Sequence, residues 1–151
     1  MGEKGNYPLS DPRSGFVVHP EKIVAVGPST RTYVAFHHMY SHKISAVAVV
    51  DLERKFQGAL SCNMIKGLQM NNIQLLVKPV LKFIEDATPS KIDLSAETGT
   101  LDMTMNDVVR KLAQSKKHRL WIVDEEQKLI GLLTLTDIIK AVVRIEPGDM
   151  S

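Results

Sequence analysis

Hydrophobic positions along the chain fall into short unbroken apolar runs and longer stretches with helical spacing. Unbroken runs between turn residues predict buried strands, and apolar residues three or four apart predict helices that bury one face. In the first half, this pattern predicts a strand, a helix, two more strands and the start of a second helix, over residues 23–26, 32–42, 45–50, 56–60 and 63–68. We expect the first helix to bury a face made of Ala35, Phe36, Met39 and Tyr40.

The middle of the chain, residues 71–99, is predicted to be a linker with helical parts. Apolar residues keep mostly helical spacing as far as Ile84, and Pro79 marks the start or a kink of the last stretch, because proline fits the first turn of a helix. Residues 87–99 are polar and contain Pro89 and Gly99, so we expect them to form a loop.

The second half repeats the order of elements in the first. Thr104 is placed to cap a helix over residues 106–115, and two strands follow at residues 120–123 and 129–133, separated by a polar turn. Thr134 or Thr136 then caps a closing helix that is predicted to extend to Arg144.

A self-match at a shift of 73 residues relates the two halves. Asp51 falls on Asp124, Gly58 falls on Gly131, and the apolar run 46–50 falls on 119–123. Such a match indicates a duplicated structural unit. We therefore predict an α/β fold of two β-α-β-β-α repeats, over residues 16–70 and 100–146, after a flexible lead-in at residues 1–15.

Composition excludes several classes of function. The net charge of +2 arises from 19 basic and 17 acidic residues that are interspersed, so no broad field favours nucleic acid. No apolar stretch reaches the roughly 18 to 20 residues that span a bilayer, so no membrane contact is expected. Cys62 is the only cysteine, which fits a reducing compartment, and we expect a location in the cytoplasm or the nucleus.

The segment Thr134-Leu135-Thr136-Asp137 has the chemistry of half a nucleotide site. Hydroxyl groups at a helix start lie beside free N–H groups and the positive end of the helix dipole, which favours a phosphate. Asp137 can accept two hydrogen bonds from a ribose diol. The structural alternative is that these residues only cap the helix, which would contribute about 0.5 to 2 kcal/mol to stability.

The order of elements, together with the Gly131 to Asp137 motif, resembles the cystathionine-β-synthase (CBS) domain, whose tandem pairs are called Bateman modules. This resemblance covers Ile23 to about Arg144. It implies a pseudo-two-fold pair of repeats with clefts that bind adenosine nucleotides. Further matches, among them Tyr33-Val34-Ala35, Asn71-Asn72-Ile73 and His118-Arg119-Leu120, are similar to the second CBS pair of the gamma subunit of AMP-activated protein kinase and its sucrose-non-fermenting relatives.

The resemblance implies roles for individual residues. It directs the hydroxyls of Thr134 and Thr136 to phosphate, Asp137 to ribose, and His118 and Arg119 to phosphates. Arg119 also suits this role chemically, because a guanidinium binds phosphate in bidentate fashion. It places Thr104 near the ligand, although Thr104 with Asp107 also has nearly the spacing of a capping box.

The first repeat departs from the family pattern. Met64 stands where the second repeat has Asp137, so the carboxylate that would hold a ribose is missing. We expect one principal site, in which Arg31 and Ser45 add phosphate contacts across the repeats. Trp121 is expected in the core.

Other chemistries have weak support. His38 and His42 have the i, i+4 spacing of metal ligands, but the accompanying glutamate of the helical motif is absent, so no metal site is expected. The sequence shows no nucleophile elbow or paired-carboxylate constellation, so catalysis and a catalytic cofactor are not expected.

The sequence therefore predicts a regulatory module that binds AMP, ADP or ATP. The resemblance implies a gamma-type energy-sensing subunit, or a fragment of one, that acts on protein kinase catalytic or scaffold subunits. The alternative is a stand-alone CBS pair that dimerises and binds nucleotide weakly or not at all. The resemblance also implies that the chain forms a homodimer or a heteromer and is not a lone monomer.

Overall fold

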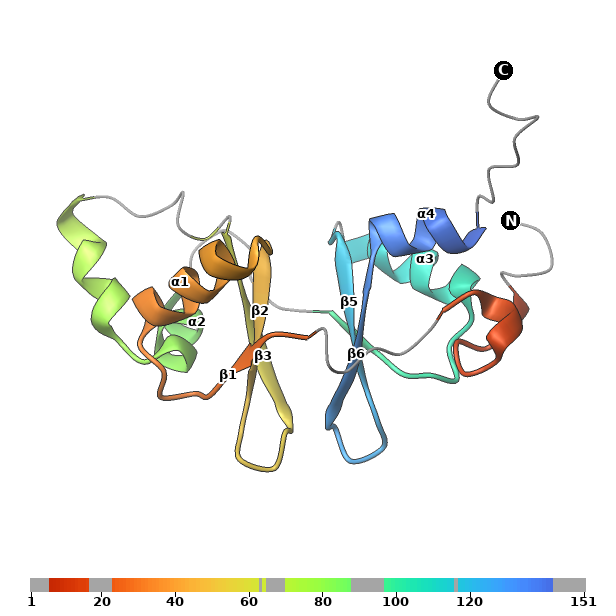
Figure 1. Ribbon diagram of the computed structural model, residues 1–151, viewed down its shortest axis with the longest axis horizontal. Helices are drawn as coiled ribbons and strands as arrows, with labels where there is room; N and C mark the ends of the chain where they lie inside the picture. The colour runs from red at the N-terminus through yellow and green to blue at the C-terminus, as the bar shows by residue number, and fades with distance from the viewer. Residues whose placement is uncertain are drawn as a thin grey trace, which may run out of the picture. The chain divides into compact units, whose positions relative to one another are not determined.

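The computed structural model describes residues 6–16, 23–62, 64, 70–87, 97–115 and 117–142. The chain divides into two compact units (Figure 1). The first-repeat unit consists of residues 21–96 and 127–129. The second-repeat unit consists of residues 1–20, 97–126 and 130–151. Segments that are far apart in sequence thus belong to the same unit.

The first-repeat unit holds a three-stranded sheet in the order β1-β2-β3, in which β1 is parallel and β3 antiparallel to β2. Helices α1 and α2 lie together on one side of this sheet (Figure 1). The elements are β1 (Ala25–Val26), α1 (Thr32–His42), β2 (Ala46–Val50), β3 (Phe56–Ser61), the 3-10 helix η5 (Met70–Val77) and α2 (Val80–Ala87).

The apolar run predicted as the second strand is the centre of this unit's core. Residues 46–49 of β2 are all buried, as expected for a strand covered on both faces. Ala35 and Met39 of α1 and Val80 of α2 pack in the same cluster. The rings of Phe36 and Phe83 meet edge to face, with their centroids 6.2 Å apart.

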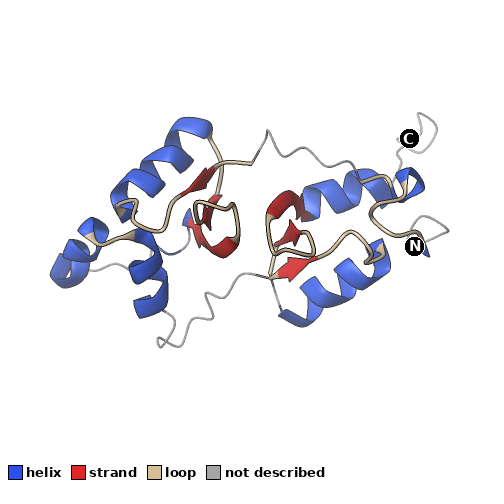
Figure 2. Cartoon of the chain, turned by 90° about the horizontal axis from the view of Figure 1, so that it is seen from below, coloured by secondary structure: helices blue, strands red, loops and turns tan. Residues whose placement is uncertain are grey.

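The second-repeat unit has the same sheet order, β4-β5-β6, with β4 parallel to β5. Figure 2 shows the helices and strands of the chain from a second direction. The elements of this unit are η2 (Pro12–Ser14), β4 (Thr98–Gly99), α3 (Met105–Ser115), β5 (Arg119–Val123), β6 (Leu129–Thr134) and α4 (Leu135–Val142).

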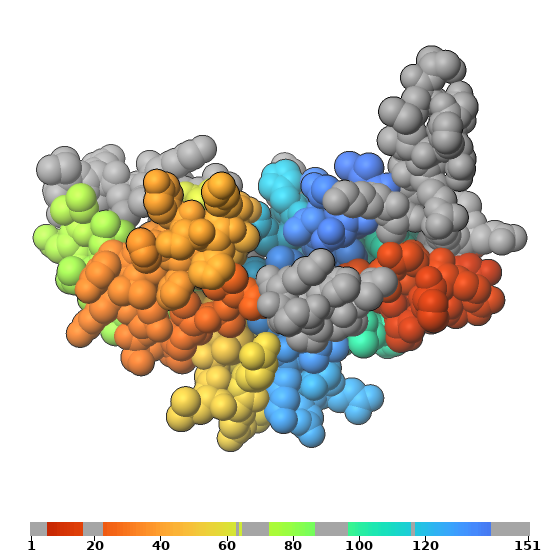
Figure 3. Space-filling model, in the orientation of Figure 1, coloured from red at the N-terminus to blue at the C-terminus, as the bar shows by residue number. Residues whose placement is uncertain are grey.

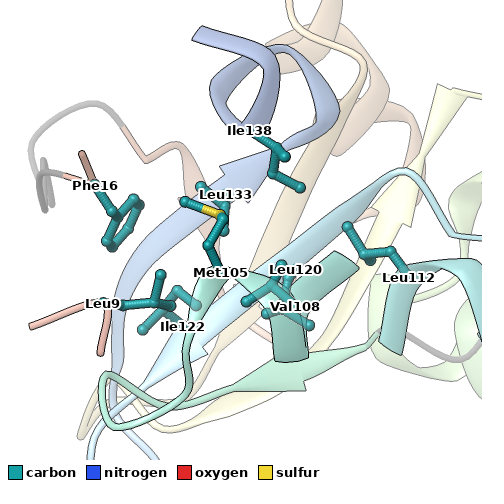
Figure 4. Close-up of a cluster of buried hydrophobic side chains, with 9 residues drawn as sticks. All are labelled: Leu9, Phe16, Met105, Val108, Leu112, Leu120, Ile122, Leu133 and Ile138. Atoms are coloured by element: carbon teal, nitrogen blue, oxygen red, sulfur yellow. The ribbon is translucent and has the colours of Figure 1, made fainter. Parts of the chain in front are cut away.

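The core of the second-repeat unit lies between its sheet and helix α3. Met105, Val108 and Leu112 are buried at helical spacing, and Leu120, Ile122 and Leu133 come from the strands (Figure 4). Trp121 is 1% exposed, which confirms its predicted place in the core.

An N-terminal strap, residues 6–16, packs on the second-repeat unit, where the sequence predicted a flexible lead-in. Leu9 is 2% and Phe16 9% exposed, and both belong to the core cluster. The amides of Leu9 and Ser10 donate to the carbonyls of Met103 and Leu101, at 2.8 and 2.9 Å. Leu9 lies between Pro8 and Ser10, and Phe16 opens a run of only three apolar residues, so neither carries a periodic signal in the sequence.

Two other predictions of local structure are wrong. Thr98 and Gly99 form strand β4 and not a loop, because they pair in parallel with Trp121 and Ile122. Tyr40 is 84% exposed, since it lies about 100° around the helix from buried Met39. The helix expected over residues 63–68, the loop at residues 88–96 and the closing helix beyond Val142 lie outside the described residues.

Candidate functional site

Strand β6 leads directly into helix α4, and a reciprocal pair of hydrogen bonds closes the junction. The amide of Thr134 donates to Oδ2 of Asp137 at 3.0 Å, and the amide of Asp137 donates to Oγ1 of Thr134 at 3.2 Å. This is a capping box in which an aspartate takes the place of the usual glutamate. Thr134 is therefore the cap, and exposed Thr136 lies within the first turn.

The capping box leaves hydrogen-bonding groups available at the α4 start. Among the described contacts, Asp137 uses only its Oδ2 oxygen, and the Thr134 hydroxyl acts as an acceptor, so its proton remains available to donate. Asp137 and Thr134 are half-buried, so both remain accessible. The cap and a ligand contact can therefore coexist at this junction.

Strand β5 begins beside the same helix start. The amide of Leu135 donates to the carbonyl of His118 at 3.1 Å, which fixes the backbone before β5 next to the first turn of α4. His118 is exposed, and Arg119, the first residue of β5, is half-buried and already interacts with other groups of the protein. The structure thus brings the backbone of His118 to the Thr134–Asp137 junction, as the prediction of a common site requires.

Thr104 caps a different helix with the same geometry. Its amide donates to Oδ2 of Asp107 at 3.0 Å, and the Asp107 amide donates to Oγ1 of Thr104 at 3.2 Å. The pKa of Asp107 is lowered, first by the hydrogen bond from the Thr104 backbone and then by the Thr104 side chain and the charge of Arg110. Among the described residues, the side-chain hydrogen bonds of Thr104 are those with Asp107, and none joins Thr104 to the α4 start.

Arg31 and Ser45 belong to the first-repeat unit. A guanidinium N–H of Arg31 (Nη1) donates to the carbonyl of Val77 at 2.9 Å and so holds the end of η5. Ser45 is exposed, and its carbonyl accepts a hydrogen bond from the Cys62 amide at 2.8 Å. Met64 packs against the core cluster of its unit, as expected for a residue that fills the core.

A pocket of about 690 Å³ occurs in the second-repeat unit, at the end of β5 opposite to Arg119. Its lining includes four acidic residues and no basic one: Thr100, Leu101, Asp102, Val123, Asp124, Glu125, Glu126 and Ile130. A phosphate is disfavoured there, because carboxylates repel it. The sequence analysis did not find this pocket, although the run of three acids after Val123 was a visible signal.

The histidines of α1 interact with their own helix. The Nδ1 atom of His42 lies 2.9 Å from the carbonyl oxygen of His38, and the two rings are 5.8 Å apart. Within the described part of the chain, no three potential metal ligands are grouped. Within the same part, every helix is too short or too polar to cross a bilayer.

Comparison with known families gives a direct match for the second repeat. Residues 99–144 match the family model described as the CBS domain. This segment contains β4, α3, β5, β6 and α4, together with the candidate residues from Thr104 to Asp137.

Curated relatives are of several kinds. The chain is 36% identical over 127 residues to an inosine-5'-monophosphate dehydrogenase of Aquifex aeolicus (strain VF5), covering 84% of this chain and 23% of that protein. It is 29% identical over 89 residues to the SNF1-related protein kinase regulatory subunit gamma-like PV42a of Arabidopsis thaliana. This match covers 58% of this chain and 25% of that protein. The chain spans about a quarter of the length of these relatives, and the mixture does not single out gamma subunits.

Solved structures share the fold of both units. The crystal structure of CBSX2 in complex with AMP has a TM-score of 0.67 at 24% identity and covers 91% of this chain and 97% of its own. The CBS domain of the bacterial CNNM/CorC family Mg²⁺ transporter in complex with ATP has a TM-score of 0.70 at 19% identity. This match covers 93% of this chain and 90% of that chain. The protein is thus built from a pair of β-α-β-β-α units of the CBS type. Residues 99–144 match the CBS domain, and the two units together have the tandem CBS fold called a Bateman module, as the sequence predicted.

Proposed function

We propose that the chain is a regulatory module that binds an adenosine nucleotide at the start of helix α4. The observation that carries the proposal is the Thr134–Asp137 junction, where a hydroxyl, a half-used carboxylate and a helix start lie beside the backbone of His118. The solved complexes with AMP and ATP support the choice of ligand, because two proteins of the same fold bind these nucleotides.

Each residue has a distinct task in this proposal. The Thr134 hydroxyl and the first turn of α4, with exposed Thr136, face the phosphate, which the helix dipole favours. The free Oδ1 oxygen of Asp137 accepts from the ribose diol. His118 and Arg119 add cationic or donor groups at the phosphate end. Thr104, which closes a separate capping box, acts in this proposal on stability alone.

The module regulates a protein that it contacts. Nucleotide binding changes the output only if two arrangements of the module differ in their affinity for the ligand. The gamma-like relative supports a protein kinase as that target. The location that we propose, the cytoplasm or the nucleus, rests on the sequence alone. The prediction from the sequence that Arg31 and Ser45 contact phosphates stays a prediction.

The second candidate function is a CBS pair whose main role is self-association. The observation that favours it is the set of exposed apolar residues on the helices of the second-repeat unit, Val109, Leu135 and Ile139. The missing carboxylate at Met64 points in the same direction. Under this hypothesis the chain dimerises equally well with and without nucleotide.

Calorimetric titration of the chain with AMP, ADP and ATP tests the proposal. We expect saturable binding of at least one nucleotide and its loss in Asp137→Ala. Asp107→Ala is the matched control, because it removes the same kind of carboxylate from the other capping box. No binding by the wild-type chain, or equal binding by Asp137→Ala, would refute the proposed site. Sedimentation of the same samples measures the dimer that the second candidate requires.

A further inference from the structure

We infer that the N-terminal strap is a positioning element for the proposed nucleotide site, acting through Leu9 and Phe16. This inference rests on the proposed function. It concerns a segment that precedes the first strand, β1, and contains none of the residues assigned to the ligand. The strap belongs to the same unit as the Thr134–Asp137 junction. It is the red segment in Figure 3.

Phe16 supports the strand that leads into the site. The ring of Phe16 lies over Gly131 of β6, where an added Cβ would come within 3.5 Å of the ring. Figure 4 shows the same ring beside Leu133, the residue immediately before Thr134. Because β6 passes into α4 without a connecting loop, the position of Leu133 fixes the position of the cap.

Leu9 supports the other side of the unit. Its amide donates a hydrogen bond to the carbonyl of Met103, and Pro8 forms an antiparallel β-bridge with Thr104. The strap therefore pairs with the segment that leads into α3. The side chain of Leu9 lies beside Ile122 of β5, the strand that begins at Arg119 (Figure 4). The strap therefore contacts both strands that carry proposed phosphate-binding residues, β5 with Arg119 and β6 with Thr134.

The internal bonds of the strap hold these two anchors at a fixed separation. The buried hydroxyl of Ser14 donates to the Leu9 carbonyl at 3.3 Å and accepts from the Phe16 amide at 3.1 Å. On the exposed side, the Arg13 guanidinium pairs with Asp11 at 2.7 Å and lies 4.1 Å from the centre of the Tyr7 ring. The strap thus has its own internal hydrogen bonds and ion pair, which fix its conformation.

A strap with two apolar anchors can also detach without unfolding the sheet beneath it. Among the described residues, the hydrogen bonds that join the strap to the rest of its unit involve the Leu9 and Ser10 amides and an Asn6–Asn106 side-chain pair, and none of them belongs to the β4-β5-β6 ladder. Detachment would free β6 and the segment before α3. Nucleotide affinity therefore depends on whether the strap is docked.

The test compares AMP, ADP and ATP affinities of the full chain, its Leu9→Ala/Phe16→Ala variant and a Leu112→Ala control. Leu112 is 3% exposed and belongs to the same core, but it lies near the other end of α3 from the strap. We expect the double variant to bind about 2- to 30-fold more weakly, the range of coupling through a packed network. Leu112→Ala should bind as the wild type does, and Phe16→Leu should restore most of the affinity.

Hydrogen exchange of the same proteins separates the two possible failures. The Leu9 and Ser10 amides should be protected in the wild type and exposed in the double variant. If the double variant loses this protection but binds nucleotide as tightly as the wild type, the inference is wrong and the proposed function stands. An equal loss of affinity in Leu112→Ala would also overturn the inference, because general stability would then explain the effect. If the wild type binds no nucleotide, the proposed function fails, and the inference fails with it.

Discussion

The two capping boxes of the second-repeat unit make a matched pair for separating stability from binding. Thr104 with Asp107 and Thr134 with Asp137 have the same two hydrogen-bond lengths, 3.0 and 3.2 Å. Thr104→Ala and Thr134→Ala each remove the hydroxyl that accepts the aspartate amide. In each variant the bond from the threonine amide to the aspartate remains, so only half of the box is lost.

The expected cost in stability is therefore equal at the two sites. Loss of a threonine cap costs about 0.5 to 2 kcal/mol, with about 1 kcal/mol as the central value. If the second-repeat unit unfolds by itself, 1 kcal/mol lowers its Tm by about 4–8 °C; if the whole chain unfolds together, by about 2–4 °C. Neither variant creates a large cavity, because threonine and alanine differ only by a hydroxyl and a methyl group at a half-buried site.

Thermal unfolding with and without nucleotide then measures the functional difference. A ligand at 100 times its Kd stabilises the folded state by about 2.7 kcal/mol. We expect Thr104→Ala to keep this gain and Thr134→Ala to lose most of it, because only Thr134 faces the proposed ligand. Equal gains in the two variants would refute the assignment of Thr134, and clearly unequal costs without ligand would refute the equivalence of the two boxes.

Three further predictions concern the fold. Gly99→Ala should lower the free energy of unfolding by about 1–3 kcal/mol through overpacking, since the new Cβ would lie 2.6 Å from Cδ2 of Leu120. Chemical denaturation measures this loss of stability, and an unchanged midpoint would contradict the prediction. Gly15→Ala should expose the amides of the strap to hydrogen exchange, because φ of Gly15 is 85°, a region that alanine disfavours; unchanged protection would contradict this. The lowered pKa of Asp107 should stabilise the fold above the ordinary value of 3.8, and this stability should be lost as the pH falls through the lowered pKa. Asp107→Asn should therefore flatten the acid limb of the stability curve, and an identical limb in variant and wild type would show that the bonds from Thr104 do not act in this way.

The fold could be predicted where local and global patterns agree. The apolar runs before Asp51 and Asp124 are the central strands. Each has four consecutive buried residues, as expected for a strand that is covered on both faces. The spacing of Thr104 and Asp107 predicted the start of α3, since a capping box is a local motif whose partners lie three residues apart. At the start of α4 the sequence left Thr134 and Thr136 as alternative caps.

The rest depends on contacts between residues that are distant in sequence. Strand β4 has only two residues and exists because β5 pairs with it, so its own sequence carries no strand signal. The strap is anchored by single apolar residues, Leu9 and Phe16, whose partners lie about a hundred residues away. Tyr40 is exposed because the face that α1 buries is narrower than its apolar composition indicated.

The candidate site could be predicted in part. The sequence predicted a site at Thr134, Asp137 and His118, and the structure places the His118 carbonyl against the α4 start. It could not show that Arg31 is used by the Val77 carbonyl, because that bond depends on how η5 ends. Nor could spacing alone decide between Thr134 and Thr136 as the cap, which the two hydrogen bonds of the box determine.

The most direct test of the central claim is a map of backbone amide shifts, recorded by NMR while AMP is added to the full chain. We predict that the largest shifts fall on Leu135, Thr136 and Asp137 at the α4 start and on Arg119 at the start of β5. Shifts that are largest around the acidic pocket at Asp124–Glu126, or an unchanged spectrum with AMP, ADP and ATP alike, would contradict the account.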